Sequence, residues 1–98
     1  MKIGYIIASN KVARERQPIG YLYREEPENQ NDSGWRVFSG EESEEYADDA
    51  ANFAMYNAST ILEIDPSIAS CLEAPWPIAY ERTSSGGFVE VPPGAMGR

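Results

Sequence analysis

The sequence predicts a small single α+β domain with a mostly antiparallel sheet and short helices in the middle of the chain. Three observations support this class: β-branched and aromatic runs lie towards both ends, turn and helix-start signals lie between them, and the chain has only 98 residues. A domain of this size buries roughly two-thirds of the surface that its unfolded chain exposes, so a core can form without disulfides or a metal. We expect the domain to span residues 1–91, followed by a frayed tail over residues 92–98.

Short apolar runs and alternating patterns predict the strands. Alternation places Tyr21 and Tyr23 on one face of the second strand, and Trp35 and Val37 on one face of the third. The predicted strands cover residues 3–8, 20–25, 35–38, 52–56, 77–82 and 88–91.

Turn-forming residues separate these strands. Residues 26–34 are rich in Pro, Asn, Asp, Ser and Gly, which predicts a hairpin with a long acidic tip. Residues 84–87 predict a tight turn between the last two strands, and residues 11–17 form a basic, polar connection.

Helix signals occupy the middle of the chain. Ser39 precedes Glu42 by three residues, the spacing of a capping box, and predicts a short helix over residues 42–48. Ser59 is expected to cap a turn that runs through Ile64. Asp65-Pro66 predicts a further helix start, because Asp caps and proline at the first helical position loses no needed hydrogen bond.

The charge balance limits the classes of partner that the chain is expected to bind. Sixteen acidic residues face eight basic ones, which gives a net charge of -8. This balance argues against nucleic acid and against anionic membranes, since both are bound mainly by Lys and Arg. It favours solubility and a basic protein partner, although acidity alone is also common among bacterial proteins that have no such partner.

The compartment expected from the sequence is the cytoplasm. The single cysteine, Cys71, allows no intramolecular disulfide, which fits a reducing environment. The apolar run over residues 3–8 is shorter than a signal-peptide core, and no stretch approaches the length of a membrane span.

The residues offer little catalytic chemistry. The chain has no histidine, which removes the commonest general base and the commonest transition-metal ligand. Cys71 lies on an apolar helical pattern and is expected to be a buried, inert thiol. The polar run at residues 29–34 lacks both anchor ligands of a calcium loop and is better explained as a turn. We therefore expect no catalytic, cofactor or metal site.

A crowd of carboxylates is the most prominent feature of the middle of the chain. Paired carboxylates can hydrolyse glycosides, but acids on one short solvated segment rarely form the cleft that this needs. A surface that tolerates such like-charge repulsion is a candidate face for a basic partner. The candidate partner-binding residues are Asp32, Trp35 and Arg36 in a loop, and Glu41, Glu44, Glu45, Tyr46, Asp48 and Asp49. Tyr46, which lies amid the acids, is the aromatic residue most expected to be exposed.

The order of motifs resembles the immunity-protein-33-like family of bacteria, formerly a domain of unknown function. Its most specific parts are Arg24-Glu25-Glu26-Pro27 and Asp32-Ser33-Gly34-Trp35-Arg36. The resemblance extends from the first strand to Arg82 through residues 21–27, 32–40, 44–46, Asn52, 64–68, Leu72 and 79–82. It implies an α+β protein found among the immunity proteins of toxin systems, and it brings no catalytic residues.

Three functions follow, in order of preference. The first is a non-enzymatic immunity protein that occludes a basic toxin surface with residues 41–49, helped by the loop at residues 32–36. The second is a housekeeping adaptor or a structural homodimer. The third is a small enzyme that uses carboxylates and Arg24, Arg36 or Arg82 on an anionic or sugar substrate.

Overall fold

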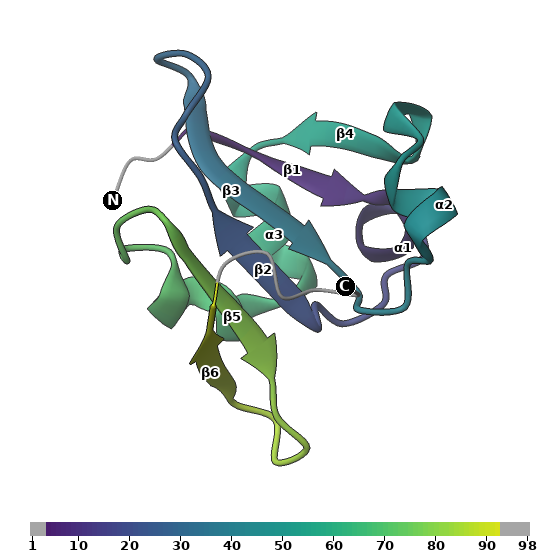
Figure 1. The fold of residues 1–98 in the computed structure, drawn as a ribbon, viewed down its shortest axis with the longest axis vertical. Helices are drawn as coiled ribbons and strands as arrows, with labels where there is room; N and C mark the ends of the chain where they lie inside the picture. The colour runs from purple at the N-terminus through teal and green to yellow at the C-terminus, as the bar shows by residue number, and fades with distance from the viewer. Residues whose placement is uncertain (1–3, 93–98) are drawn as a thin grey trace.

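The computed structural model describes residues 4–92, and all six of its strands join one sheet (Figure 1). The strands are β1 (Tyr5–Ser9), β2 (Tyr21–Arg24), β3 (Asp32–Phe38), β4 (Phe53–Tyr56), β5 (Ile78–Arg82) and β6 (Phe88–Val91). The helices are α1 (Asn10–Ala13), α2 (Glu44–Ala47) and α3 (Ala58–Ile64), with 3-10 turns η1 (Ala50–Asn52) and η2 (Pro66–Cys71). All but the first residue of the tail expected over residues 92–98, and Ile3 of the expected first strand, lie outside the described residues.

The strand order is β4-β1-β3-β2-β5-β6. The β1–β3 pair is parallel, and the four other pairs are antiparallel. The expected hairpins β2–β3 and β5–β6 are both present. The α+β class with a mostly antiparallel sheet is thus confirmed.

One face of the sheet is covered by helices and holds the main core. In Figure 1, α3 lies behind the sheet. Ile61 of α3 and Ile68 of η2 pack there against Leu22, Trp35 and Val37 from the central strands. This face contains the residues that alternation predicted to lie together.

The opposite face carries a second, aromatic cluster. Tyr21 and Phe38 are buried in it, and Tyr23 and Phe53 pack against them. The Phe38 ring stacks on Tyr23 with centroids 5.9 Å apart and meets Phe53 edge-on at 5.5 Å. Helix α2 lies beside this cluster, because the Tyr46 ring packs near Phe53.

The third strand begins earlier than the sequence predicted. Asp32, Ser33 and Gly34 were expected in a loop, but they belong to β3. Between two paired positions, β1 advances from Tyr5 to Ile7 while β3 advances from Asp32 to Arg36, so β3 bulges. The turn-forming composition of this segment therefore serves a bulge inside the sheet.

Gly34 shows why the bulge needs its sequence. Its φ is +86°, and a Cβ at this position would lie 2.3 Å from the carbonyl oxygen of Glu25. Only glycine fits this combination of backbone conformation and close approach.

The helices of the middle region also differ in detail from those expected. Residues 11–17 were expected to be only a connection, but α1 forms there because Val12 is fully buried in the core. Helix α2 starts at Glu44 with Ser43, not Ser39, as its N-cap, since the Ser43 side chain accepts a hydrogen bond from the Tyr46 amide. Helix α3 starts at Ala58, so Ser59 lies inside it. The expected start at Asp65-Pro66 is confirmed, because the Asp65 side chain accepts a hydrogen bond from the Ser67 amide.

Candidate functional site

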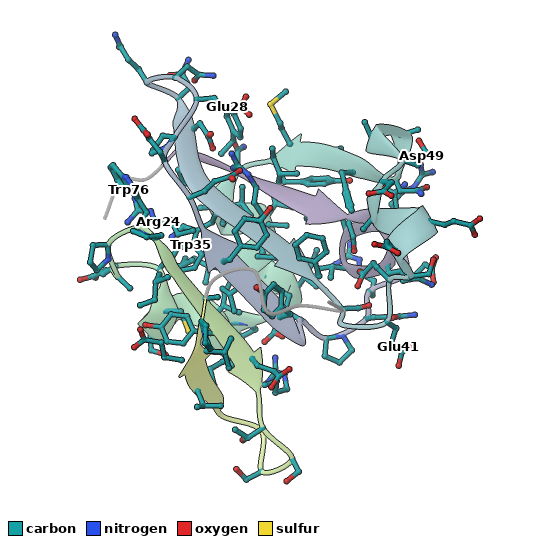
Figure 2. The ribbon with its side chains drawn as sticks, in the orientation of Figure 1. Arg24, Glu28, Trp35, Glu41, Asp49 and Trp76 are labelled. Atoms are coloured by element: carbon teal, nitrogen blue, oxygen red, sulfur yellow. The ribbon has the colours of Figure 1, made fainter. Side chains whose placement is uncertain are left out.

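The acidic segment, defined as residues 41–49, surrounds α2 and displays most of its carboxylates to solvent. Glu41, Glu44, Glu45, Asp48 and Asp49 are all exposed. Figure 2 shows Glu41 and Asp49 pointing outward on either side of α2. The structure thus places these five candidate residues on one short stretch of surface.

Tyr46 is less exposed than the sequence suggested. It is half-buried, with its ring packed near Phe53 at 6.2 Å between centroids and with Lys11 Nζ lying 5.1 Å from its centre. The ring attaches α2 to the edge of the sheet, so its first role is to position the acidic segment.

Asp32, Trp35 and Arg36 do not form the exposed loop that was expected. All three are buried in β3. Arg36 lies on the aromatic face of the sheet, whereas Trp35 lies in the main core. The expectation of an exposed loop is therefore wrong, because these residues belong to β3 and the bulge turns the polar groups of Asp32 and Arg36 towards one another.

The buried charges of β3 satisfy each other. Arg36 donates two hydrogen bonds to the Asp32 carboxylate, at 2.8 and 2.9 Å, and a third at 2.8 Å to Glu25. The Asp32 carboxylate also accepts hydrogen bonds from the backbone amides of Glu28 and Gly34. The hydrogen bond from Arg36 is the largest cause that holds the pKa of Asp32 well below its usual range, against the opposing effect of burial. This pair therefore stays ionised and holds the loop end of the β2–β3 hairpin in place.

Trp35 belongs to a second anchoring cluster. Its indole nitrogen donates a hydrogen bond to the carbonyl oxygen of Leu72 at 3.1 Å, which ties β3 to the end of η2. The Arg24 guanidinium lies between the rings of Trp35 and Trp76, 5.8 and 5.1 Å from their centroids (Figure 2). Arg24 also donates hydrogen bonds to the carbonyl oxygens of Ser33 and Ala74.

The third candidate arginine is equally engaged. Arg82 forms an ion pair with Asp65 and donates a hydrogen bond to the Ile19 carbonyl oxygen at 2.7 Å. Its guanidinium also lies 4.5 Å from the ring centre of Phe88. The three arginines suggested as anion-binding groups thus all hold parts of the scaffold together.

Cys71 is buried at the end of η2, and burial raises the pKa of its thiol. Within residues 4–92, no three acidic or cysteine side chains converge in a way that could hold a metal ion. A functional site is therefore expected on the surface of the domain.

A groove of about 1120 Å³ lies on the aromatic face, and sequence reasoning missed it. Its floor includes Tyr21, Tyr23, Phe38 and Phe53. Four carboxylates, one arginine, one further tyrosine and six apolar side chains complete its lining: Glu25, Glu28, Glu44, Asp48, Arg36, Tyr5, Ile7, Val37, Ala47, Ala50, Ala54 and Met55. We call this the aromatic groove. Alternation predicted that Tyr21 and Tyr23 share a face, but only the fold brings β3, β4 and α2 beside them.

The whole described sheet except its first residue falls within one family match. Residues 6–92 match the Immunity protein Imm33 domain. The chain belongs to the Imm33 family. No curated protein and no solved structure matches it significantly. The family expected from the motifs is thereby confirmed, and the match includes both the acidic segment and every strand that lines the aromatic groove.

Across the described part of this Imm33 domain, no helix has the length and apolar character needed to cross a bilayer.

Glu42 is the one carboxylate of the acidic segment that turns inward in the Imm33 domain. It accepts hydrogen bonds from the Ser9 hydroxyl and from the backbone amides of Ser39 and Gly40. Burial opposes its ionisation, but these hydrogen bonds outweigh that effect and hold the pKa of Glu42 below its ordinary value. Glu42 thus joins the acidic segment to the end of β1 and the end of β3.

We expect Glu42→Gln to destabilise the Imm33 domain at pH 7 by about 1.5–3 kcal/mol, the usual value of a hydrogen bond to a charged group. A lowered folded-state pKa gives stability that is complete above the unfolded-state pKa, near 4.3, and is lost as pH falls through the folded value. The difference between wild type and variant should therefore shrink below about pH 4. Urea unfolding midpoints measured from pH 3 to 8 check this, with the exposed Glu41→Gln as the control; a difference that is constant with pH would contradict it.

Proposed function

We propose that this chain is an immunity protein that neutralises a bacterial toxin by binding it, without catalysing a reaction. The observation that carries the proposal is the match to the Immunity protein Imm33 domain over residues 6–92. The engagement of Arg24, Arg36 and Arg82 in scaffold contacts supports a binding role over a catalytic one.

The proposed mechanism is occlusion of a basic surface on the toxin by the acidic segment. Five exposed carboxylates on and around α2, on a chain with a net charge of -8, produce a negative field on this side of the molecule. Such a field accelerates encounter with a positive surface and disfavours acidic competitors. The hydrogen bonds of Glu42 hold the segment in place, so little ordering entropy is lost on binding.

We expect reversal of three charges in the acidic segment, Glu44→Lys with Glu45→Lys and Asp48→Lys, to weaken binding to a toxin encoded beside the gene by at least about tenfold, or 1.4 kcal/mol. Like-charge contacts would replace attraction, and most of the change should appear as slower association at low salt. Calorimetric titration and stopped-flow association at two salt concentrations measure both effects.

A matched control reverses three exposed carboxylates on the helix-covered side of the molecule: Glu63, Glu73 and Glu90. This variant has the same net charge as the test variant and should bind with nearly wild-type affinity once long-range effects are screened by salt. Equal binding by wild type and the test variant would remove the acidic segment as the contact surface. Failure of any neighbouring toxin to bind, or to be neutralised, would remove the immunity function.

A further inference from the structure

We propose that the contact surface is the aromatic groove itself, and that it receives an Arg- or Lys-bearing segment of the toxin whose apolar parts lie on the aromatic floor. This inference rests on the proposed function and makes it more specific. The residues that contribute most to binding are then the aromatic floor, which lies outside the acidic segment, and Glu44 and Asp48, which line the groove beside it.

The floor has the composition that protein interfaces favour at their centres. Phe38 is itself buried, but it stacks on Tyr23 and meets Phe53 edge-on, and so supports these two half-buried rings, which an occupant can reach. Met55 extends this floor at the edge strand β4, where it is 63% exposed. Aromatic residues and Met are enriched in interface cores, and rigid aromatic anchors lose little side-chain entropy on binding.

The rim of the groove selects the charge of the occupant. Four carboxylates line it: Glu25 and Glu28 from the hairpin, and Glu44 and Asp48 from α2. Among the described lining residues the one base is Arg36, and its guanidinium is already paired with Asp32 and Glu25. The groove therefore presents unbalanced negative charge beside aromatic rings, which suits a guanidinium or ammonium group in both its carboxylate and its cation–π interactions.

The same charges argue against the other occupants. A second copy of this chain would bring a net charge of -8 against the same acidic rim, and like charges in an interface cost several kcal/mol. A nucleic acid would meet the same repulsion. A basic protein segment is the occupant that satisfies both the apolar floor and the acidic rim.

The groove divides the acidic segment into two sets. Glu44 and Asp48 line the groove, whereas Glu41, Glu45 and Asp49 do not. Glu28 lies on the hairpin, well away from Glu41 and Asp49 beside α2 (Figure 2). Two triple variants with the same net charge therefore separate groove binding from general acidity: a groove variant (Glu28→Lys, Glu44→Lys, Asp48→Lys) and an outside variant (Glu41→Lys, Glu45→Lys, Asp49→Lys).

The first test needs no toxin. The full chain is titrated with a capped pentapeptide that carries two arginines around a leucine, and with the matched peptide that carries two glutamates. We expect the arginine peptide alone to shift the backbone NMR signals of Phe38, Phe53 and Met55, and the groove variant to weaken this binding at least tenfold. No response of these signals to the arginine peptide would overturn the proposal, as would shifts confined to Glu41, Glu45 and Asp49.

Two further outcomes would assign the groove to another occupant and overturn the proposal. One is dimerisation of the wild type that the groove variant abolishes, measured by analytical ultracentrifugation. The other is a peptide response that appears only after Arg98→Ala, which would assign the groove to the chain's own C-terminus.

The second test uses the toxin encoded beside the gene. We expect the groove variant and the uncharged Met55→Ser each to weaken binding, by at least tenfold and about threefold respectively, while the outside variant stays within threefold of wild type. Circular dichroism and unfolding midpoints must first show that all variants fold. If the groove and outside variants weaken binding equally, the groove inference fails and the immunity function stands; if the wild type neither binds nor neutralises the toxin, the function itself fails.

Discussion

Asp32→Ala is expected to lower the free energy of unfolding by about 3–5 kcal/mol, the usual result of removing one partner of a buried ion pair. The substitution leaves the buried Arg36 guanidinium with only the half-exposed Glu25 as a carboxylate partner. It also deprives the backbone amides of Glu28 and Gly34 of their acceptor. Urea or guanidinium unfolding, followed by circular dichroism, measures the loss.

Glu25→Ala is the matched control for this prediction. Glu25 pairs with the same guanidinium at 2.8 Å, but its side chain is 47% exposed. An exposed pair contributes at most about 1 kcal/mol. Equal losses for the two variants would contradict the assignment of Asp32 as the buried anchor and would indicate that Arg36 is held mainly from the solvent side.

Trp35→Ala should cost about 3–5 kcal/mol, the range found for truncating a large aromatic residue in a core. The variant loses a fully buried ring, the hydrogen bond to Leu72 and one side of the Arg24 sandwich. Chemical unfolding followed by circular dichroism is the measurement, because the substitution itself changes the fluorescence.

Trp76 offers a control of the same residue type on the other side of the same guanidinium. It is 46% exposed, so Trp76→Ala should lose little more than a cation–π contact, about 0.5–1 kcal/mol. These are the only two tryptophans, so each variant leaves a single tryptophan, whose emission can be excited selectively over that of the tyrosines. We expect the emission of Trp35 alone to be blue-shifted relative to that of Trp76 alone. Similar costs and similar spectra for the two variants would contradict the buried position of Trp35.

Local patterns were sufficient for most of the strands. The last strand was predicted with the bounds that β6 has, and β2 and β5 lie within the predicted ranges. Alternation also correctly placed Tyr21 and Tyr23 on one face of their strand, and Trp35 and Val37 on one face of theirs. These predictions held because side-chain direction in a strand is a local property with a period of two.

The start of β3 could not be predicted in the same way. Turns favour the residue types found at positions 32–34. In a turn, the Asp32 and Ser33 side chains would form hydrogen bonds with nearby backbone amides, and Gly34 would supply the positive φ. In the fold they form such local hydrogen bonds within a strand: Asp32 accepts from the Gly34 amide and pairs with Arg36, while the Ser33 hydroxyl also donates to the Tyr5 carbonyl oxygen of the neighbouring strand. A single sequence does not show which of these two solutions the chain adopts.

The candidate site was predicted in part for a related reason. Exposure of Glu41, Glu44, Glu45, Asp48 and Asp49 followed from composition alone, since such a density of like charge cannot be buried. The aromatic groove depends on β4 and α2 returning beside β2 and β3, which is a consequence of topology. Assignment of the cytoplasm, of a homodimer or of a particular toxin stays a prediction.

Few substitutions are tolerated at the bulge of the β2–β3 hairpin, because Gly34 must be glycine and Asp32 and Arg36 must stay paired inside the sheet. The solvated carboxylates around α2 make few such demands, and their exchange should leave folding nearly unaffected. Exposed groove-lining residues such as Glu44 and Asp48 could therefore be replaced one at a time while each variant still folds. Because the strict sequence requirements lie in the interior, the exposed rim of this domain can vary in charge and shape without loss of the fold.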